Sequence, residues 1–370
     1  MDYSYWEYKT WLSDIDYTII GSGIVGLSCA LQLRVKYPSA KIVVLERGVL
    51  PNGASTKNAG FACFGSLSEI LDDLSSHSED EVVQLVEKRW KGLELLRKQL
   101  GDDRIRFKQY GGYELFTEDD RALYEECISK LDTVNRLLYP IFKQNVFSCT
   151  NNTFQFQNIQ SQYIFNQFEG QIDTGAMMNT LVQKAQNHGI YILNNCTVQE
   201  IEDQKTSVIL KTNHFTFSSQ RVCIATNGFA SQLGISDVKP ARAQVLITQP
   251  IPDLPIKGTF HLDKGYYYFR NIDNRILFGG GRNLDFKAEE TTVLTQTALV
   301  QDKLEEILRE VILPNTPFEV AHRWSGIMGV GAQKQSIVKP ISENVYCGVR
   351  LGGMGVAIGS LVGKELADLL

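Results

Sequence analysis

Hydrophobic positions in the first fifty residues alternate between short uniform runs and helical spacing. The runs IDYTII and KIVVLE, within residues 15–47, have the length and composition of buried strands. Between them, LSCALQLRVKY places Leu27, Ala30 and Leu31 on one face of a helix, which Pro38 ends. The pattern therefore predicts a strand, a turn, a helix and a second strand.

Two long helices are predicted in the segment that follows. Residues 79–100 carry an apolar stripe at helical spacing, and Gly101 is expected to end that helix. A second helix is expected to start at TEDD (117–120), run towards Tyr139 and end before Pro140. These helices interrupt the α/β beginning.

The α/β pattern returns from residue 171. A helix is predicted over 173–189, strands over 190–202, 207–212 and 221–226, and strand-rich segments over 241–250 and 259–284 with a turn at Asp273–Asn274. A helix over 295–310, a strand over 345–349, a glycine loop and a C-terminal helix complete the chain. The fold class is therefore α/β, with its parts separated by insertions.

The turn GSGIVG supplies Gly21, Gly23 and Gly26 between the first strand and its helix. In such a motif the first glycine permits a tight turn, the second lets the backbone approach a pyrophosphate, and the third permits close helix–strand packing. Glu46 ends the next strand twenty residues after Gly26, where a carboxylate accepts from ribose hydroxyls and repels a 2′-phosphate. The motif indicates a dinucleotide other than NADP.

NAD and FAD share this motif, and three distant segments favour FAD. They are GASTKNAGF from Gly53, CIATNGFAS (223–231) and VRLGGMGVAIG (349–359). Small residues in the first segment let a pyrophosphate and a flat ring lie close to the backbone. The last segment offers a second helix N-terminus, which favours the negative charge that flavin carbonyls gain on reduction.

Over nearly its whole length the chain resembles the D-amino acid oxidase-like FAD-dependent oxidoreductases, which include glycine and sarcosine oxidases. The shared motifs are IIGSGIVGLSCA, VVLERG followed by GASTKNAG, CIATNG, RAQVLIT, YYYFRNIDNRILFGGG, RWSGIM and the terminal glycine segment. The resemblance implies a discontinuous GxGxxG-type FAD-binding domain (1–80, 166–238 and 320–370). It also implies a substrate domain built on an antiparallel β-sheet (81–165 and 239–319).

The motifs together with the resemblance assign the cofactor-binding residues. They are Gly21, Gly23, Ile24, Val25, Gly26, Glu46, Arg47, Ala54, Ser55, Thr56, Asn58, Ala59, Gly60, Val198, Ala225, Thr226, Asn227, Gly228, Gly326, Gly352, Gly353, Met354, Gly355 and Val356. Of these, the loop 53–60 is expected to lie along the pyrophosphate and ribityl chain, and Val198 to contact adenine through its backbone.

Departures from the family pattern qualify what the resemblance implies. Members with covalent FAD use a His in the loop that matches 53–60 or a Cys near 323–328, and this chain has neither. We therefore expect non-covalent FAD. Met328 stands where glycine-oxidase-like members place a carboxylate-binding Arg, and Leu277 near where sarcosine-oxidase-like members place a Lys implicated in oxygen activation. The substrate and the choice between oxidase and dehydrogenase stay open.

Tyr266, Arg270 and Lys57 are the candidate catalytic residues. Strand alternation in YYYFRN puts Tyr266, Tyr268 and Arg270 on one face, which is either an aromatic wall over the flavin or a sheet surface without chemistry. Lys57 is either a flavin-side residue or a solvated charge. For Arg242 and Arg323 a structural salt bridge is favoured over a ligand role, and the five histidines form no recognisable constellation.

Composition and charge narrow the partners. A net charge of −5 gives no attraction for nucleic acid, and no run is long enough to span a membrane. Seven scattered cysteines indicate reduced, mostly buried thiols in a cytoplasmic protein, and no metal site is expected. The N-terminal Tyr5, Trp6, Trp11 and Leu12 are expected to pack onto the domain as an extra arm.

We expect an FAD-dependent oxidoreductase that oxidises a small amine or amino acid by hydride transfer to flavin N5. The electron acceptor, oxygen or a carrier, is not determined by the sequence. One alternative is an FAD-dependent 2-hydroxy acid dehydrogenase of the 2-hydroxyglutarate type. Two more distant ones are an NAD-dependent dehydrogenase and a non-catalytic nucleotide-binding protein.

Overall fold

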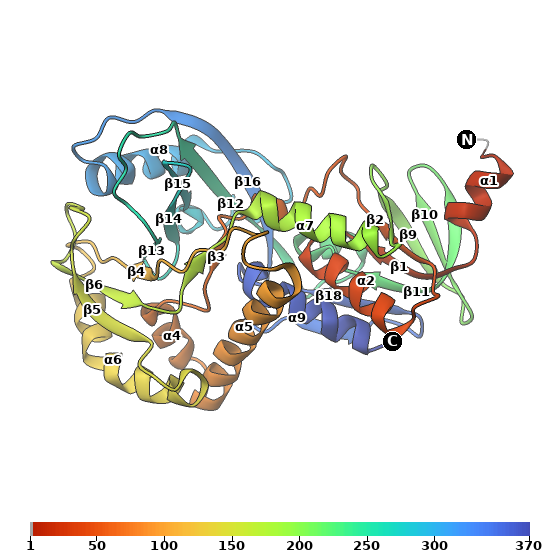
Figure 1. Ribbon diagram of the computed structural model, residues 1–370, viewed down its shortest axis with the longest axis horizontal. Coiled ribbons are helices and arrows are strands. Elements are labelled where there is room, and N and C mark those ends of the chain that lie inside the picture. Colours follow the sequence, from red (N-terminus) through yellow and green to blue (C-terminus); the bar gives the residue numbers. More distant parts are fainter. Residues whose placement is uncertain (1–2) are drawn as a thin grey trace.

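Two large β-sheets, each flanked by helices, make up the molecule (Figure 1). The computed structural model describes residues 3–370, so that residues 1–2, which belong to the predicted segment 1–80, lie outside the described residues. Each sheet has eight strands, and a third sheet has two short strands, β3 (Phe61–Ala62) and β7 (Gly170–Gln171). The mixed α/β class predicted from the sequence is confirmed.

The first sheet carries the predicted nucleotide-binding beginning and the end of the chain. Its parallel core runs in the order β18, β11, β1, β2, β8, with β17 antiparallel at one edge and β9 and β10 extending from β11. The strands are β1 (Ile15–Ile20), β2 (Ile42–Leu45), β8 (Tyr191–Leu193), β9 (Val198–Asp203), β10 (Val208–Thr212), β11 (Thr216–Ile224), β17 (Ile337–Pro340) and β18 (Val345–Val349).

The second sheet is antiparallel except where β13 pairs with β4, in the order β16, β12, β15, β14, β13, β4, β6, β5. Its strands are β4 (Gly112–Glu114), β5 (Phe147–Asn151), β6 (Gln162–Asn166), β12 (Lys239–Thr248), β13 (Thr259–Leu262), β14 (Tyr267–Ile272), β15 (Arg275–Gly280) and β16 (Val320–Val330). The strand β16 lies in this sheet, although the predicted boundary at 320 groups it with the first.

Helices cover one face of the first sheet and part of the second. α2 packs between α9 and α7, and α5 lies along α9 (Figure 1). The helices are α1 (Tyr5–Glu7), η1 (Tyr8–Leu12), α2 (Ile24–Lys36), α3 (Ala54–Lys57), α4 (Leu67–Leu74), α5 (Glu79–Leu100), α6 (Arg121–Phe142), α7 (Thr174–Asn187), η2 (Asn227–Leu233), η3 (Arg282–Leu284), α8 (Ala298–Ile307), η4 (Leu308–Ile312) and α9 (Gly355–Asp368).

Two secondary-structure predictions are wrong for identifiable reasons. The expected strand over 190–202 breaks between β8 and β9, because Asn195 has a φ of 56° and Cys196 N–H donates to the Glu46 carbonyl. Helix α6 does not end before Pro140 but continues to Phe142. Phe142 is buried against the rings of Phe64, Trp90 and Phe168, so burial outweighs the local cost of a proline in the last turn.

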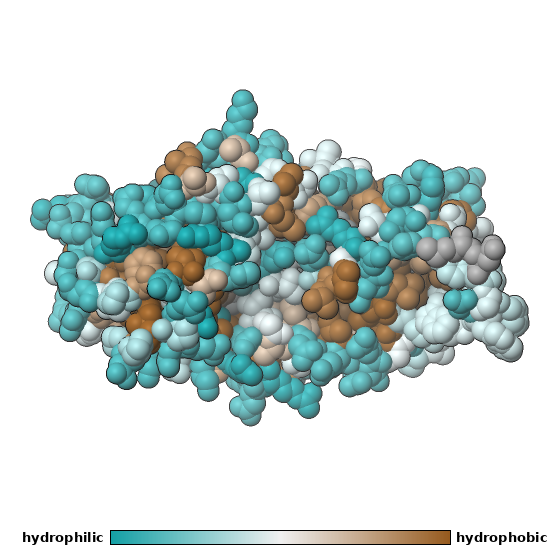
Figure 2. Space-filling view, turned by 90° about the horizontal axis from the view of Figure 1, so that it is seen from above, coloured by the Kyte–Doolittle hydropathy of each residue, from teal (hydrophilic) through white to brown (hydrophobic). Residues whose placement is uncertain are grey.

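The N-terminal arm contacts the domain through Tyr3, whose ring meets that of Phe215 edge to face, and through its end. Leu12 is buried as expected, whereas Tyr5 and Trp6 are 65% and 70% exposed and Trp11 is 39% exposed. The expectation that Tyr5 and Trp6 pack onto the domain is therefore wrong. Seen from above, the surface is mostly hydrophilic, with hydrophobic residues gathered in separate patches (Figure 2). Within residues 3–370 no helix combines the length and hydrophobicity that crossing a bilayer requires.

Candidate active site

A single cavity of about 600 Å³ runs from the GSGIVG turn to the second sheet. This volume is within the range of small-molecule and cofactor sites, about 300–1,000 Å³. Its lining comes from α2, α3 and α9 on one side and from β12, β13, β14 and β16 on the other. The cavity therefore joins the predicted nucleotide site to the predicted substrate sheet.

The structure agrees with the tight turn predicted at Gly21 and the close packing predicted at Gly26, while the role predicted for Gly23 stays a prediction. Gly21 has a φ of 107°, which disfavours any side chain. A Cβ on Gly26 would lie 1.9 Å from the Gly21 carbonyl oxygen, so this glycine lets α2 pack against the turn. Gly23 is the N-terminal cap of α2 and lines the cavity, and a Cβ there would lie 2.8 Å from Ser55 Oγ.

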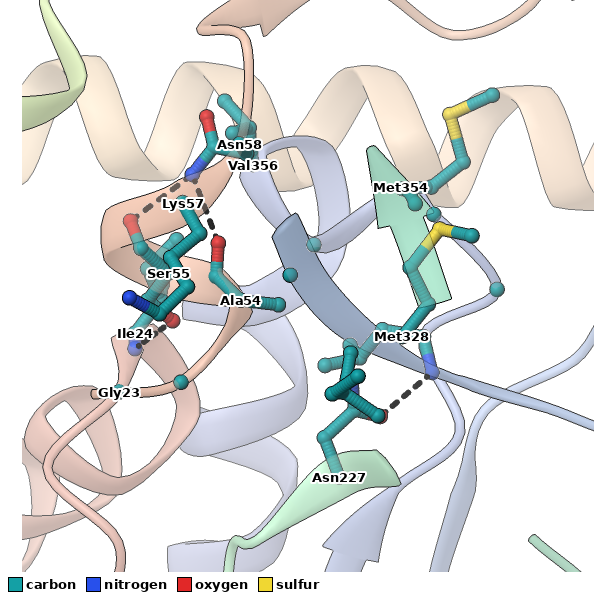
Figure 3. Close-up of a pocket in the computed structure, with 18 of the residues that line it drawn as sticks. Gly23, Ile24, Ala54, Ser55, Lys57, Asn58, Asn227, Met328, Met354 and Val356 are labelled. Carbon is teal, nitrogen blue, oxygen red and sulfur yellow. Dashed lines mark hydrogen bonds between the residues drawn. The ribbon is translucent and has the colours of Figure 1, made fainter. Parts of the chain in front are cut away.

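The loop at 53–60 folds into α3 beside this turn. Ser55 Oγ accepts from the Ile24 N–H at 3.0 Å, and the Asn58 amide donates to the Ser55 carbonyl at 2.8 Å. In Figure 3, Ala54, Ser55 and Lys57 lie on the opposite side of the view from Met328 and Met354. Trp324 Nε1 on β16 donates to the Lys57 carbonyl at 2.9 Å, which fixes the loop against the second sheet.

Two helix N-termini face the cavity. Among the described residues, neither N-cap residue, Gly23 of α2 or Met354 of α9, supplies a capping side chain, and Ser55 Oγ accepts from the first-turn Ile24 N–H of α2. The loop before α9 turns through Gly352 and Gly353, whose φ angles are 56° and 85°. Both termini favour negative charge in the cavity.

Glu46 and Arg47 line the cavity at the end of β2. The Glu46 carboxylate is buried and accepts from the Ser22 hydroxyl at 2.6 Å and from the Gly48 N–H at 2.8 Å. Arg47 stacks on Phe229, with its guanidinium carbon 3.6 Å from the ring centroid. A fixed carboxylate at this point matches the ribose-binding role predicted for Glu46.

Most predicted site residues meet at this cavity. Among residues 3–370 the lining includes all of the predicted residues except Gly26, Thr56, Gly228 and Arg270. Gly26 and Gly228 provide close packing, because a Cβ on Gly228 would lie 2.5 Å from the Met328 carbonyl oxygen. The Thr56 hydroxyl donates within the loop to the Pro51 carbonyl at 2.8 Å. The roles assigned to the individual residues stay predictions.

The second sheet presents aromatic residues to the cavity. Tyr266 and Tyr268 line it, while Tyr267 and Phe269 pack into the core on the other face, as the alternation predicts. Burial raises the pKa of Tyr268 to about 12. Its hydroxyl therefore stays protonated at neutral pH.

Arg270 shares this face but is enclosed behind Gly60. Its Nη2 lies 2.9 Å from the position of a Cβ on Gly60, and the residue is 2% exposed. Within the described chain the guanidinium forms no hydrogen bond or ion pair, and its Nε is fully enclosed. Burial lowers the pKa of Arg270 to about 10.

A buried polar cluster, which the sequence did not reveal, adjoins the tyrosines. His261 Nε2 lies 2.5 Å from Glu169 Oε1, and Cys63 Sγ lies within 4.8 Å of both groups. Burial raises the pKa of the Cys63 thiol well above its usual value. Donors of these three types also suit a metal, but His261 Nε2 is already engaged by Glu169.

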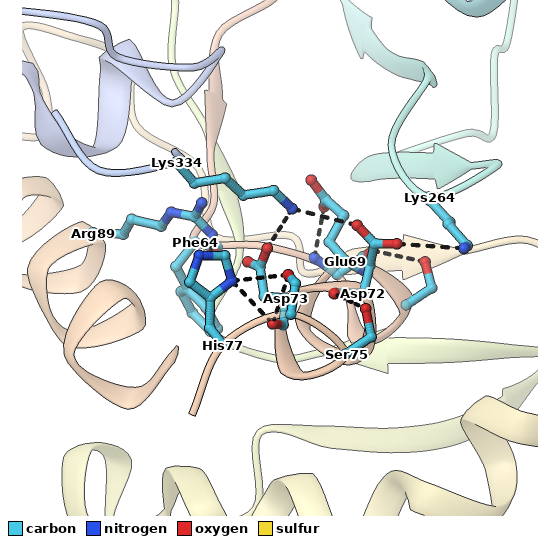
Figure 4. Close-up of polar contacts among 12 residues, drawn as sticks. Phe64, Glu69, Asp72, Asp73, Ser75, His77, Arg89, Lys264 and Lys334 are labelled. Atoms are coloured by element: carbon cyan, nitrogen blue, oxygen red, sulfur yellow. Dashed lines mark hydrogen bonds and ion pairs between the residues drawn. The ribbon is translucent and has the colours of Figure 1, made fainter. Parts of the chain in front are cut away.

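The rim of the cavity is formed by acidic α4 and two lysines. Figure 4 shows Lys334 and Lys264 approaching Asp72 from two directions, and Lys334 also pairs with Asp73. Asp73 is 2% exposed, and Lys334 is the only cation that pairs with it among residues 3–370. The Lys334–Asp73 pair therefore has a buried carboxylate, while both side chains of the Lys264–Asp72 pair are exposed.

This difference gives a testable prediction. Lys334→Met should lower the free energy of unfolding by about 1–3 kcal/mol, because it leaves the buried Asp73 carboxylate without a partner. Lys264→Met, which breaks an exposed pair, should cost no more than about 0.5 kcal/mol. Denaturant unfolding of both variants measures this difference, and equal losses would contradict the structural reason.

Arg242 and Arg323 are paired residues, as favoured from the sequence. Arg242 forms two bonds to Glu289, at 2.7 and 2.8 Å, with both side chains buried. Arg323 pairs with Glu305 and donates to Gln301 at 2.5 Å. The seven cysteines, all of them described, form no disulfide, and six are buried.

The residues present fit FAD. The N-termini of α2 and α9 suit its anionic parts, and Glu46 suits its ribose. The cavity continues from these residues to Tyr266 and Tyr268, so it extends further than a site that holds only a nucleotide needs to. The motif glycines, Glu46, the 53–60 loop and the start of α9 would hold the cofactor.

The chain is similar to known oxidoreductases in sequence and in fold. Oxidoreductase OrdL of Haemophilus influenzae, named as probable, is 22% identical over 98% of this chain and 84% of its own length. Gamma-glutamylputrescine oxidoreductase of Escherichia coli is 21% identical over 96% of this chain and 83% of its own. The crystal structure of glycine oxidase from Geobacillus kaustophilus superposes with a TM-score of 0.73 at 19% identity, covering 96% of this chain and 94% of that one.

The family assignment covers nearly the whole chain. Residues 16–369 match the FAD dependent oxidoreductase (DAO) family. The matched segment includes both large sheets and every motif that lines the cavity. This chain is a member of the DAO family of FAD-dependent oxidoreductases.

Proposed function

We propose that this chain uses non-covalent FAD to oxidise the CH–NH bond of a small amine or amino acid. The observation that carries the proposal is the continuity of the cavity between the dinucleotide motifs and the tyrosine face of the second sheet. Bound FAD supplies a hydride acceptor at N5. Two relatives bear the names of an amino acid and an amine, glycine oxidase and gamma-glutamylputrescine oxidoreductase.

The second sheet would position the substrate. Tyr266 and Tyr268 form an aromatic wall that excludes water, and the protonated Tyr268 hydroxyl is available as a hydrogen-bond donor. Lys57, on the opposite wall, adds a positive charge beside Gly326, where a Cβ would lie 3.1 Å from Lys57 Cβ. These groups orient a substrate, and its ammonium proton leaves to solvent before oxidation.

An anaerobic screen of the FAD-loaded protein tests the proposal. Glycine, N-methylglycine, D- and L-amino acids, diamines and 2-hydroxyglutarate are mixed with it separately, and bleaching of the flavin absorption band is followed. At least one amine or amino acid should bleach the band. Bleaching by 2-hydroxyglutarate alone would support the hydroxy acid alternative, and no bleaching by any compound would support a non-catalytic role. Admitting oxygen afterwards distinguishes an oxidase from a dehydrogenase.

The attachment of FAD gives a second prediction. Acid precipitation of the holoprotein should leave the flavin in the supernatant, because the residues used for covalent attachment in the family are missing here. Cys63 and Cys196 are the thiols that line the cavity within the described chain, and burial raises the pKa of both. Both therefore remain protonated and weakly nucleophilic.

The measurement is the absorption spectrum of supernatant and pellet. Unfolding in guanidinium followed by filtration is the control for flavin trapped in the acid pellet. Flavin that stays with the protein after both treatments would contradict non-covalent binding.

A further inference from the structure

His261 lines the cavity on the sheet face that the tyrosines occupy. It lies on β13 opposite Tyr268 of β14, and it is 5% exposed. The ring of Phe61 meets the His261 ring edge to face, with centroids 5.2 Å apart. The imidazole therefore lies beside the aromatic rings of the cavity wall.

The two ring nitrogens have different surroundings. Nε2 is bound to Glu169 Oε1 at 2.5 Å, and Glu169 is itself buried. Nδ1 has no hydrogen-bond partner among residues 3–370, yet it is not one of the fully enclosed polar atoms without partners. His261 lines the cavity, so an Nδ1 atom that is not fully enclosed can open to it. A buried ring with one nitrogen fixed and the other free is arranged to bind something in the cavity.

The charges around His261 keep it protonated. Burial alone would lower its pKa, but attraction to Glu169, the hydrogen bond to it, and the charges of Glu69 and Glu114 raise the pKa to about 9. The Cys63 thiol and the Tyr268 hydroxyl are the other titratable groups beside the His261 ring. Burial raises the pKa of both. At neutral pH both ring nitrogens therefore carry protons, and Nδ1 can only donate.

We propose that His261 binds a carboxylate of the substrate by donating from Nδ1, and that Glu169 is a positioning residue that holds the ring through Nε2. This inference rests on the proposed function, because it names the substrate class as an amine that carries a carboxylate. The side chain of Met328, on β16, lines the same cavity without a charge. The imidazolium supplies the positive donor that Met328 lacks.

The rim residues do not offer an equivalent site. Lys264 and Lys334 are paired with α4 carboxylates, and their side chains are 43% and 45% exposed. A carboxylate there would compete with Asp72 and with water, whereas a charge-assisted bond to a buried donor is stronger. An ammonium is also excluded as the ligand of Nδ1, because a protonated ring has no acceptor.

The test uses the FAD-loaded full chain and benzoate, an aromatic carboxylate suited to the Phe61 and Tyr268 walls. Benzamide, which has the same shape without the charge, is the matched probe. Perturbation of the flavin absorption spectrum during titration gives Kd for each. In the wild type, benzoate affinity should fall as pH rises through about 9, where His261 loses its proton, while benzamide affinity should stay constant.

Two variants separate binding from positioning. His261→Gln should weaken benzoate by at least about tenfold with little effect on benzamide, because only the charged probe loses a charge-assisted bond. Glu169→Gln should move the benzoate pH midpoint to lower pH, because the carboxylate that holds the proton on His261 is gone. His188→Gln, at an exposed helix end, is the matched control and should change the affinity for neither probe.

Several outcomes would overturn the proposal. The first is a benzoate affinity that does not vary between pH 7 and 10.5 in the wild type. The second is an equal weakening of benzoate and benzamide binding in His261→Gln. The third is an unchanged pH midpoint of benzoate binding in Glu169→Gln. The wild-type profile decides even if a variant does not fold. Reduction of the flavin by amines together with a flat benzoate profile would reject this inference and leave the proposed function intact. If benzoate affinity falls with rising pH but no amine reduces the flavin, the proposed function is rejected and the carboxylate site at His261 is kept.

Discussion

Gly23→Val is expected to abolish retention of FAD while leaving the fold intact. The φ of Gly23 is −76°, which valine adopts without strain, in contrast to Gly21 at 107°. Gly26 is unsuitable for this test because any Cβ there collides with backbone. Gly23 is thus the motif glycine at which a side chain tests the cofactor site and not the fold.

The loss follows from where the side chain would project. A Cβ on Gly23 would lie 2.8 Å from Ser55 Oγ, in the lining of the cavity. Valine's two methyl groups would displace Ser55 from its bond with the Ile24 N–H and fill the space that a pyrophosphate must approach. We expect Kd for FAD to rise at least about 100-fold, or about 2.7 kcal/mol.

The measurement is the flavin-to-protein ratio after purification, followed by titration of the apoprotein with FAD. Gly175→Ala, at an exposed position in the first turn of α7, is a control for glycine replacement and should keep its flavin. Thermal unfolding of both apoproteins checks that the fold survives. A Gly23→Val protein that purifies with normal flavin content would show that the dinucleotide lies elsewhere.

Local patterns predicted the parts of the fold that local chemistry determines. The GSGIVG turn combines strand, glycines and helix within a dozen residues, and the structure reproduces it as β1 and α2. The Asp273–Asn274 turn is equally local. Both residues have positive φ angles, 49° and 55°, as a two-residue hairpin turn between β14 and β15 requires.

Distant contacts set what the sequence did not predict. His261 and Glu169 are 92 residues apart and meet only because β13 and the β6–β7 connection are brought together. Nothing in the residues around His261 marks it as protonated or cavity-facing. The break between β8 and β9 likewise depends on Glu46, whose carbonyl accepts from the Cys196 N–H. A single sequence carries periodicity and motifs, but not these pairings.

The pairing of the buried Arg242 was predicted in part: the sequence indicated that a partner exists but not which residue it is. A buried arginine must be paired, so the sequence favoured a salt bridge without naming the partner. The structure supplies Glu289, 2% exposed, with further bonds from Gln244 to the same carboxylate at 2.9 Å and from Arg242 to Thr295 at 2.6 Å. This network ties the segment before α8 to β12.

Arg242→Met is therefore expected to lower the free energy of unfolding by about 3–5 kcal/mol, because it leaves the Glu289 carboxylate buried without its cation. Arg242→Met combined with Glu289→Leu should recover part of that loss, since no charge then remains buried. Lys239→Met breaks the nearby Lys239–Glu290 pair, whose side chains are 63% and 49% exposed, and should cost no more than about 0.5 kcal/mol.

Denaturant unfolding is measured for the wild type and the three variants, together with the flavin content of each folded sample. These measurements distinguish a structural role for Arg242 from a role at the cavity. A structural role predicts a large loss of stability together with normal flavin content and normal benzoate affinity in the protein that remains folded. Wild-type stability in Arg242→Met would contradict it, because a buried carboxylate cannot lose its bidentate partner without cost. Weakened benzoate binding at unchanged stability would instead place Arg242 among the groups that act on the cavity.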